Sequence, residues 1–132
     1  MQLSEDMVVK FKISKKVWDF LRSVVQSDFE RCGLLFGRGD VVLQAIEIEN
    51  IRKSPVEFEL SPLESLKAFE EAEEKNLEVV GVWHTHLQNA TPSAKDIQGM
   101  KNFPGLWIIS SRKEIRGYVL EREVLEVELE II

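Results

Sequence analysis

The two histidines of this chain, His84 and His86, stand one residue apart, and Ser93 and Asp96 follow shortly after them. In an extended strand the side chains at i and i+2 point to the same face, so the two imidazoles would converge. Imidazole nitrogens and carboxylate oxygens are common ligands of Zn²⁺ in proteins. The pattern therefore predicts a metal site, with Asp96 as the nearest third ligand. Three protein ligands would leave a fourth position open for water, as in catalytic zinc sites.

The same residues also have a plainer interpretation. A His-x-His pair occurs by chance in strands, and Ser93 followed three residues later by Asp96 is a typical helix N-terminus. The two interpretations are compatible, because a capping residue can also place a ligand. A catalytic zinc site needs a base as well. Glu30 is the candidate, although on its own it would be taken for a surface residue.

Three helices are predicted around these residues. Ser14 can cap a helix over residues 15–25, and Ser61-Pro62 begins a second helix with a serine cap and a proline in its first turn. The apolar stripe of this second helix is predicted from Leu63, Leu66, Phe69 and Ala72. The third helix is short and begins at Ser93.

The strands are predicted from apolar and β-branched runs separated by turn residues. One of them, residues 77–86, ends on the histidine pair. An α+β fold with a mixed, mostly antiparallel sheet is therefore expected. The strands are expected at residues 7–13, 30–36, 41–51, 77–86, 106–110, 115–120 and 124–131, and residues 56–60 are a candidate for one more.

Composition limits the classes of function. The chain has 132 residues, which suits one domain over residues 1–132. Its net charge of −6 disfavours a nucleic-acid partner, because acidic surfaces repel phosphates. Cys32 is the single cysteine, and neither a signal peptide nor a membrane span is recognisable, so a cytoplasmic protein is expected. The abundance of Glu and Lys is typical of a thermophile.

Taken together, three motifs resemble the JAMM (MPN+) metalloprotease family. They are Glu30 before Gly33-Leu34-Leu35, then His84-Thr85-His86, then Ser93 and Asp96, and Asn50 and Phe58 also resemble the family. The resemblance covers nearly the whole chain in order. It implies an MPN fold, which is cytidine-deaminase-like, with two main helices flanking the sheet and a short helix at the metal site.

The resemblance also implies a role for each motif residue. His84, His86 and Asp96 would bind one Zn²⁺ per chain together with a water. Glu30 would act as general base, and Ser93 would donate a hydrogen bond to the oxyanion. Two departures concern the loop after His86, where Leu87 stands in place of the usual proline and the loop up to Ser93 is about one residue shorter than in the usual family pattern.

Members of this family cut the bond after the C-terminal Gly-Gly of ubiquitin or a ubiquitin-like protein. The resemblance implies a zinc isopeptidase that removes a ubiquitin-like β-grasp modifier from lysine, in the manner of a desampylase or deubiquitinase. Alternatives are a processing protease for sulfur-carrier β-grasp proteins, a non-catalytic MPN scaffold, a two-His-one-carboxylate iron oxygenase and a nuclease-associated relative. The natural modifier and the oligomeric state, a homodimer included, stay open.

The three tryptophans and two other apolar residues are candidates for a binding surface. Trp83 and Trp107 lie within apolar strands and are expected in the core. Trp18 lies on the expected apolar face of the first helix. Leu87 and Phe103 flank the predicted site and are candidates for substrate contact or for packing.

Overall fold

The computed structural model describes residues 9–25 and 28–132, which form three helices and seven strands. The strands follow the predicted order, except that residues 56–60 form no strand and only Leu60 makes an isolated bridge, with Asn50. The helices are α1 (Lys15–Ser23), α2 (Pro62–Glu74) and α3 (Ala94–Asn102). The strands are β1 (Lys10–Ile13), β2 (Cys32–Arg38), β3 (Val41–Ile48), β4 (Glu78–Thr85), β5 (Leu106–Ser110), β6 (Ile115–Leu120) and β7 (Val124–Ile131).

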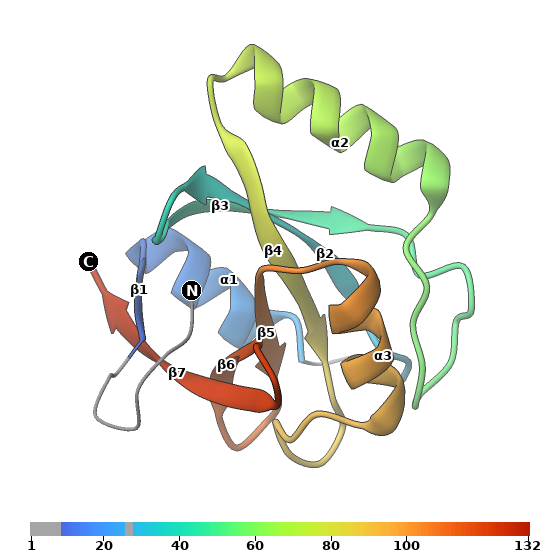
Figure 1. The fold of residues 1–132 in the computed structure, drawn as a ribbon. Coiled ribbons are helices and arrows are strands. Elements are labelled where there is room, and N and C mark those ends of the chain that lie inside the picture. Colours follow the sequence, from blue (N-terminus) through green and yellow to red (C-terminus); the bar gives the residue numbers. More distant parts are fainter. Residues whose placement is uncertain (1–8, 26–27) are drawn as a thin grey trace.

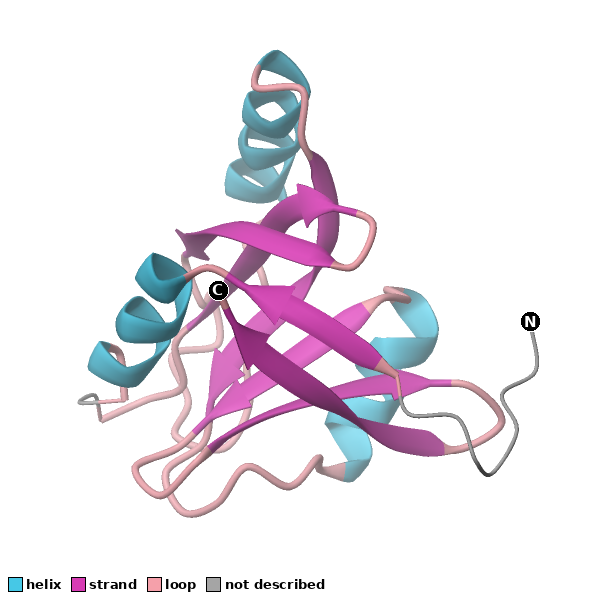
Figure 2. Cartoon of the chain, turned by 90° about the vertical axis from the view of Figure 1, so that its left-hand side faces the viewer, coloured by secondary structure: helices cyan, strands magenta, loops and turns pink. Residues whose placement is uncertain are grey.

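The strands close into a barrel in the order β1-β3-β2-β4-β5-β6-β7 (Figures 1 and 2). The pairs β2–β3, β2–β4, β5–β6 and β6–β7 are antiparallel, whereas β1 is parallel to β3 and β7, and β4 is parallel to β5. The predicted mixed, mostly antiparallel sheet is confirmed. Because β4 and β5 are parallel neighbours, the chain must cross over between them, and α3 lies in that crossover.

Two apolar clusters lie on opposite faces of the sheet, as the period of two along each strand requires. Leu34 and Trp107 belong to the cluster beneath α2 and α3, and Leu35 and Trp83 to the cluster beneath α1. The expectation that Trp83 and Trp107 are core residues is confirmed, since both are buried. Trp18 is only half-buried. His84 follows Val82 by two residues and so faces α3.

Gly33 allows the close packing of β2 against its neighbours. A Cβ atom at this position would lie 1.8 Å from the carbonyl oxygen of Ile46 and 2.6 Å from Nε1 of Trp83. That Nε1 group donates a hydrogen bond to the same carbonyl, at 3.1 Å. A side chain at position 33 would therefore push β2 away from β3 and displace the indole of Trp83, which lies next to His84 on β4.

Several predicted boundaries were wrong. The second strand begins at Cys32 rather than at Glu30, and the third ends at Ile48, because Asn50 turns its side chain to the backbone of the following loop. The first helix ends at Ser23. Residues 1–8 lie outside the described residues, so the first strand is seen only from Lys10.

The predicted apolar stripe of α2 was wrong for three of its four residues, and only Ala72 is buried as predicted. Leu63, Leu66 and Phe69 are 63%, 58% and 43% exposed, and the helix packs on the barrel through Ala68 and Ala72. Small residues at i and i+4 let the helix approach the sheet closely, which leaves its larger apolar side chains outside. Among the described residues, no helix is both long enough and apolar enough to cross a membrane.

Candidate metal centre

The end of β4 and the start of α3 bring His84, His86 and Asp96 together. The two histidine Nε2 atoms are 3.1 Å apart. One carboxylate oxygen of Asp96 lies 3.0 Å from Nε2 of His84, and the other lies 3.0 Å from Nε2 of His86. His84 and Asp96 are buried, and His86 is mostly so. Three potential ligand atoms thus converge on one point.

The donor set of this cluster fits a small divalent cation. Bonds of about 2.0–2.2 Å at tetrahedral angles would place two ligand atoms roughly 3.3–3.5 Å apart, close to the 3.0–3.1 Å found here. A buried carboxylate also needs compensating positive charge. The ion-pair partners of Asp96 within the described residues are the two histidines, which carry that charge only when protonated. The arrangement indicates a metal-binding site.

Glu30 lies beside this cluster, in the connection that leads into β2. Its backbone N–H donates to the carbonyl of Ser54 at 2.8 Å, and its carbonyl accepts a hydrogen bond from Nδ2 of Asn50 at 2.7 Å. A carboxylate oxygen of Glu30 and a ring nitrogen of each histidine all lie within 4.8 Å of one another. The structure therefore brings Glu30 to the histidine pair and buries it, where the sequence alone suggested a surface residue.

Burial and mutual contacts shift the pKa values of the carboxylates and imidazoles of the cluster. Burial raises the pKa of Glu30 to about 7, and the nearby Asp96 charge adds to this while His86 opposes it. Burial would also raise the pKa of Asp96, but hydrogen bonds from both histidines hold it well below its usual range. Burial lowers the pKa of His84. Burial disfavours the charged form of His86 too, but Asp96 and Glu30 raise its pKa overall.

The raised pKa of Glu30 predicts that this residue destabilises the metal-free fold at neutral and higher pH. Its pKa is about 7 in the folded protein against 4.5 ordinarily, so the stability it contributes is complete below pH 4.5 and lost as the pH rises through 7. With chelator present, Glu30→Gln should be more stable than the parent by about 3 kcal/mol near pH 8, with little difference near pH 4. Urea unfolding at a series of pH values measures this. A difference that does not change with pH would contradict it.

Ser93 is the N-cap of α3 and also borders the hollow in front of the cluster. As N-cap of α3 its Oγ accepts a hydrogen bond from the backbone N–H of Asp96 at 3.1 Å, and its own N–H donates to Asp96 Oδ2 at 2.9 Å. The cap thus fixes the carboxylate that faces the histidines. Ser93 also lines a hollow of about 370 Å³ together with Glu30, His86 and Leu87. The hydroxyl proton of Ser93 has no acceptor within the described part of the chain, so it can be donated to a ligand in this hollow.

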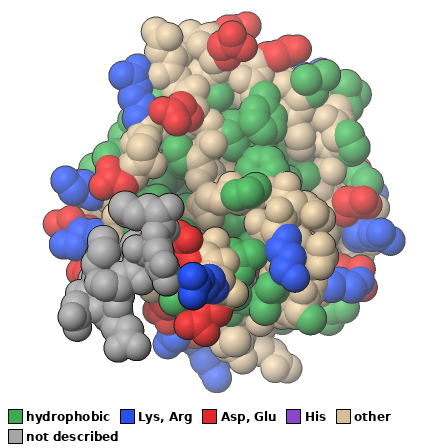
Figure 3. All heavy atoms as spheres, viewed as in Figure 1, with side chains coloured by type: hydrophobic (Ala, Val, Ile, Leu, Met, Phe, Trp, Pro, Cys, Tyr) green, Lys and Arg blue, Asp and Glu red, His purple; other side chains and the backbone are tan. Residues whose placement is uncertain are grey.

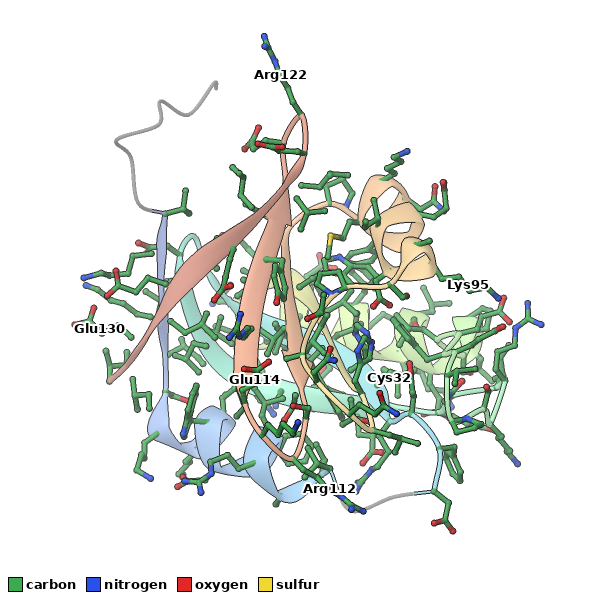
Figure 4. The ribbon with its side chains drawn as sticks, turned by 90° about the horizontal axis from the view of Figure 1, so that it is seen from below. Cys32, Lys95, Arg112, Glu114, Arg122 and Glu130 are labelled. Carbon is green, nitrogen blue, oxygen red and sulfur yellow. The ribbon has the colours of Figure 1, made fainter. Side chains whose placement is uncertain are left out.

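The shortened loop after His86 is anchored at two points. Nδ1 of His86 lies 3.0 Å from the carbonyl oxygen of Asn89. Ala90 is buried, its N–H donates to Glu114 at 3.3 Å, and its carbonyl accepts from the Tyr118 hydroxyl at 2.6 Å. Glu114 lies in the turn between β5 and β6 (Figure 4). Leu87 is 40% exposed at the hollow, which favours ligand contact over packing.

Asn50 supports the site in a way that sequence reasoning did not assign. It is buried, and its amide donates to the carbonyls of Glu30 and Glu57, at 2.7 and 3.1 Å. Its oxygen accepts from the N–H groups of Arg52 and Glu59. One side chain thus ties the backbone of Glu30 to the loop before α2. The signal in the sequence that could have indicated this role is the position of Asn50, a polar residue just after an apolar strand.

Comparison with known proteins places this site in a family. Residues 22–121 match the family described as prokaryotic homologs of the JAB domain. The chain is also 45% identical over 114 residues to a desampylase of Pyrococcus furiosus, covering 85% of this chain and 81% of that protein. The chain belongs to the prokaryotic JAB-domain family. This membership confirms the resemblance to JAMM proteins.

Solved structures agree with the JAB-domain assignment. A protein of Desulfitobacterium hafniense, 26% identical, superimposes with a TM-score of 0.79 over 92% of each chain. A structure titled "JAMM: A Metalloprotease-like Zinc Site in the Proteasome and Signalosome", 22% identical, has a TM-score of 0.61 and covers 94% of this chain and 99% of its own. The second likeness shows the fold alone. The predicted α+β fold of the MPN class is confirmed.

Proposed function

We propose that this JAB-domain protein is a zinc-dependent isopeptidase that cleaves the bond after the C-terminal Gly-Gly of a ubiquitin-like modifier attached to lysine. The observation that carries the proposal is the convergence of His84, His86 and Asp96 beside the buried carboxylate of Glu30. The 45% identity to a desampylase supports the choice of bond and partner. A scaffold protein that had lost its activity would not need to keep Glu30, His84, His86 and Asp96 together.

In this proposal the two buried carboxylates have different roles. Asp96, whose Oδ1 lies 3.0 Å from His84 Nε2 and whose Oδ2 lies 3.0 Å from His86 Nε2, is the third zinc ligand. Glu30, which has no such short contact with either histidine among the described residues, acts as general base. When bound, zinc would polarise the scissile carbonyl and lower the pKa of the attacking water. Glu30 takes a proton from that water and returns it to the leaving lysine amine. Burial, which raises the pKa of Glu30 in the metal-free fold, makes it a stronger base than an exposed glutamate.

Ser93 is proposed to stabilise the oxyanion, and Ser93→Ala is expected to lower kcat by about 10²–10³-fold. The variant also loses an N-cap, which costs about 1 kcal/mol. Ser61→Ala is the matched control, because Ser61 caps α2 in the same way. Steady-state kinetics and thermal unfolding of both variants separate the two effects. Equal loss of activity in both would leave Ser93 a structural cap only.

The hollow in front of the cluster suits a glycine tail. Pro55 and Val56 line it on one side, and residues 87–89 and Thr91 line it on the other. Val56 is 71% exposed, so an extended peptide can lie against it. Two successive glycines would let the backbone approach the cluster without a side chain meeting either wall. The scissile bond after them would then lie between Glu30 and Ser93.

The exposed row on α2 suits the body of a modifier protein. Leu63, Leu66 and Phe69 are exposed on one helix, and Phe69 contacts the ring of Phe103 on α3 with the centroids 6.1 Å apart. Figure 3 shows exposed hydrophobic side chains over this helix, at the upper right. Apolar patches of this kind mark protein–protein contacts. A small β-grasp protein seated on α2 would send its tail towards the hollow.

The test of the proposal is to incubate the zinc-loaded protein with lysine conjugates of ubiquitin-like proteins and with linear fusions, and to identify the cut bond by mass spectrometry. Release of a modifier ending in Gly-Gly, abolished by chelator and restored by zinc, is the expected result. Cleavage of linear fusions alone would favour processing of sulfur-carrier proteins instead. Iron bound in preference to zinc, with no cleavage of any substrate, would favour the oxygenase alternative.

A further inference from the structure

The imidazole of His84 is held by aromatic rings. Phe58 stacks on it with ring centroids 4.4 Å apart and an interplanar angle of 28°, and Trp107 meets it edge-on at 5.8 Å and 78°. Its Nε2 atom faces Asp96. Its Nδ1 atom is buried and has no hydrogen-bond partner among the residues that the structure describes.

The two histidines are therefore oriented in different ways. A metal-ligating histidine normally has its second ring nitrogen hydrogen-bonded to a carbonyl or a carboxylate, which fixes the ring. His86 follows this rule, with Nδ1 at 3.0 Å from the carbonyl oxygen of Asn89. His84 does not follow it. Since no such hydrogen bond sets the angle of the His84 ring, its packing against Phe58 and Trp107 must do so.

Both rings line one cavity, but Phe58 is the more exposed of the two and the one that a ligand could move. Trp107 is buried in β5 and its Nε1 donates to the carbonyl of Phe103 at 2.9 Å, so it is fixed. Phe58 is only half-buried and belongs to the loop between β3 and α2. It lines a cavity of about 330 Å³ between this loop and α3, which Phe103 and Asp96 also line.

The loop is fixed to the rest of the site on both sides of Phe58. Glu57 forms an ion pair with Lys95 at the start of α3 (Lys95 is labelled in Figure 4). The backbones of Glu57 and Glu59 form hydrogen bonds with the side chain of Asn50. Asn50 also holds the carbonyl of Glu30. A ligand that fills the cavity therefore presses on a side chain whose surroundings are tied to Asn50 and to α3.

We propose that Phe58 is a positioning residue: it orients His84 for the metal and couples occupancy of the adjacent cavity to metal affinity. The cavity and the hollow of the proposed function share Val56, so a peptide with its Gly-Gly end in the hollow can place the preceding side chain in the cavity. That side chain pins Phe58, which restricts the His84 ring to the metal-binding angle. The metal and the peptide then each bind more tightly in the presence of the other, by the same factor. The peptide part rests on the proposed function, whereas the metal part does not.

The metal part is tested by zinc titration against a competing chelator. Phe58→Leu should weaken zinc binding by about 10–100-fold, as loss of an outer-shell partner does. Phe58→Tyr keeps the stacked ring and should bind zinc like the parent. Phe103→Leu is the matched control, because Phe103 lines the same cavity but contacts Phe69 rather than His84. The visible spectrum of the Co²⁺-loaded proteins should change for Phe58→Leu alone, which reports altered ligand geometry rather than altered stability.

The coupling is tested by repeating the titration with a synthetic peptide that has a leucine ahead of a C-terminal Gly-Gly. The parent should bind zinc about 5–150-fold more tightly with the peptide present, and Phe58→Leu should lose this gain. Equal zinc affinity and equal Co²⁺ spectra in Phe58→Leu and Phe103→Leu would overturn the positioning role. A peptide effect that survives in Phe58→Leu would overturn the coupling. Neither readout requires catalysis, so failure of the isopeptidase proposal would appear separately, as absence of cleavage.

Discussion

Glu30→Gln is expected to lower kcat for a modifier–lysine conjugate by about 10²–10⁴-fold, the usual contribution of a general base. Glutamine has nearly the same shape as glutamate but cannot accept the proton of the attacking water. The ligand atoms of His84, His86 and Asp96 are unchanged, so zinc content should stay the same. Because the loss falls on the chemical step, KM should change far less than kcat. Single-turnover kinetics measure the rate of the chemical step, and metal analysis measures the zinc content.

The matched control for this prediction is Glu47→Gln. Glu47 also carries a carboxylate close to β2 in space, since it pairs with Arg31, but it is partly exposed and lies outside the hollow. Removing a surface ion pair costs roughly 0–1 kcal/mol and should leave turnover unchanged. Full activity in Glu30→Gln would exclude Glu30 as the base. Loss of zinc from Glu30→Gln would instead show that Glu30 is a metal ligand. This is the natural alternative to a general base, because a carboxylate oxygen of Glu30 lies within 4.8 Å of the histidine nitrogens.

The parts of the site that were predictable from the sequence are those set by local rules. The period of two along β4 placed His84 and His86 on one face, and the Ser93 cap three residues before the N–H of Asp96 set the start of α3. Both follow from spacing alone. Glu30 is different, because only its similarity to a family motif linked it to residues far along the chain, and the structure supplies the contact through Asn50.

The parts that were not predictable depend on what packs against each element. The apolar period of α2 fits Leu63, Leu66 and Phe69 as well as it fits Ala68 and Ala72, and only the barrel beneath decides which set is buried. Closure of the barrel depends on β1 pairing in parallel with both β3 and β7, which no local pattern encodes. The stacking of Phe58 on His84 likewise arises from a loop with no regular structure.

His86→Ala should abolish zinc binding at micromolar concentrations and with it all cleavage. Losing a direct ligand should cost more affinity than the about 10–100-fold typical of an outer-shell partner. Thermal unfolding gives a readout that is independent of activity. Zinc at about 100 times its Kd should stabilise the parent by about 2.7 kcal/mol, and His86→Ala should unfold at the same temperature with or without zinc. Gln88→Ala, on the exposed part of the same loop, is the control and should keep the zinc-dependent shift.

The comparison of His86→Ala with Asp96→Asn distinguishes a zinc centre from a capped helix that merely borders two histidines. If Asp96 is only the capping partner of Ser93, asparagine can replace it with little loss, since its side-chain oxygen still accepts the Ser93 N–H. If Asp96 balances a metal, the loss of its negative charge should weaken zinc binding even though the cap survives. If zinc still stabilises both variants, the cluster is not the zinc-binding site. Loss of zinc-dependent stabilisation in both variants is the outcome that the 3.0 Å contacts predict.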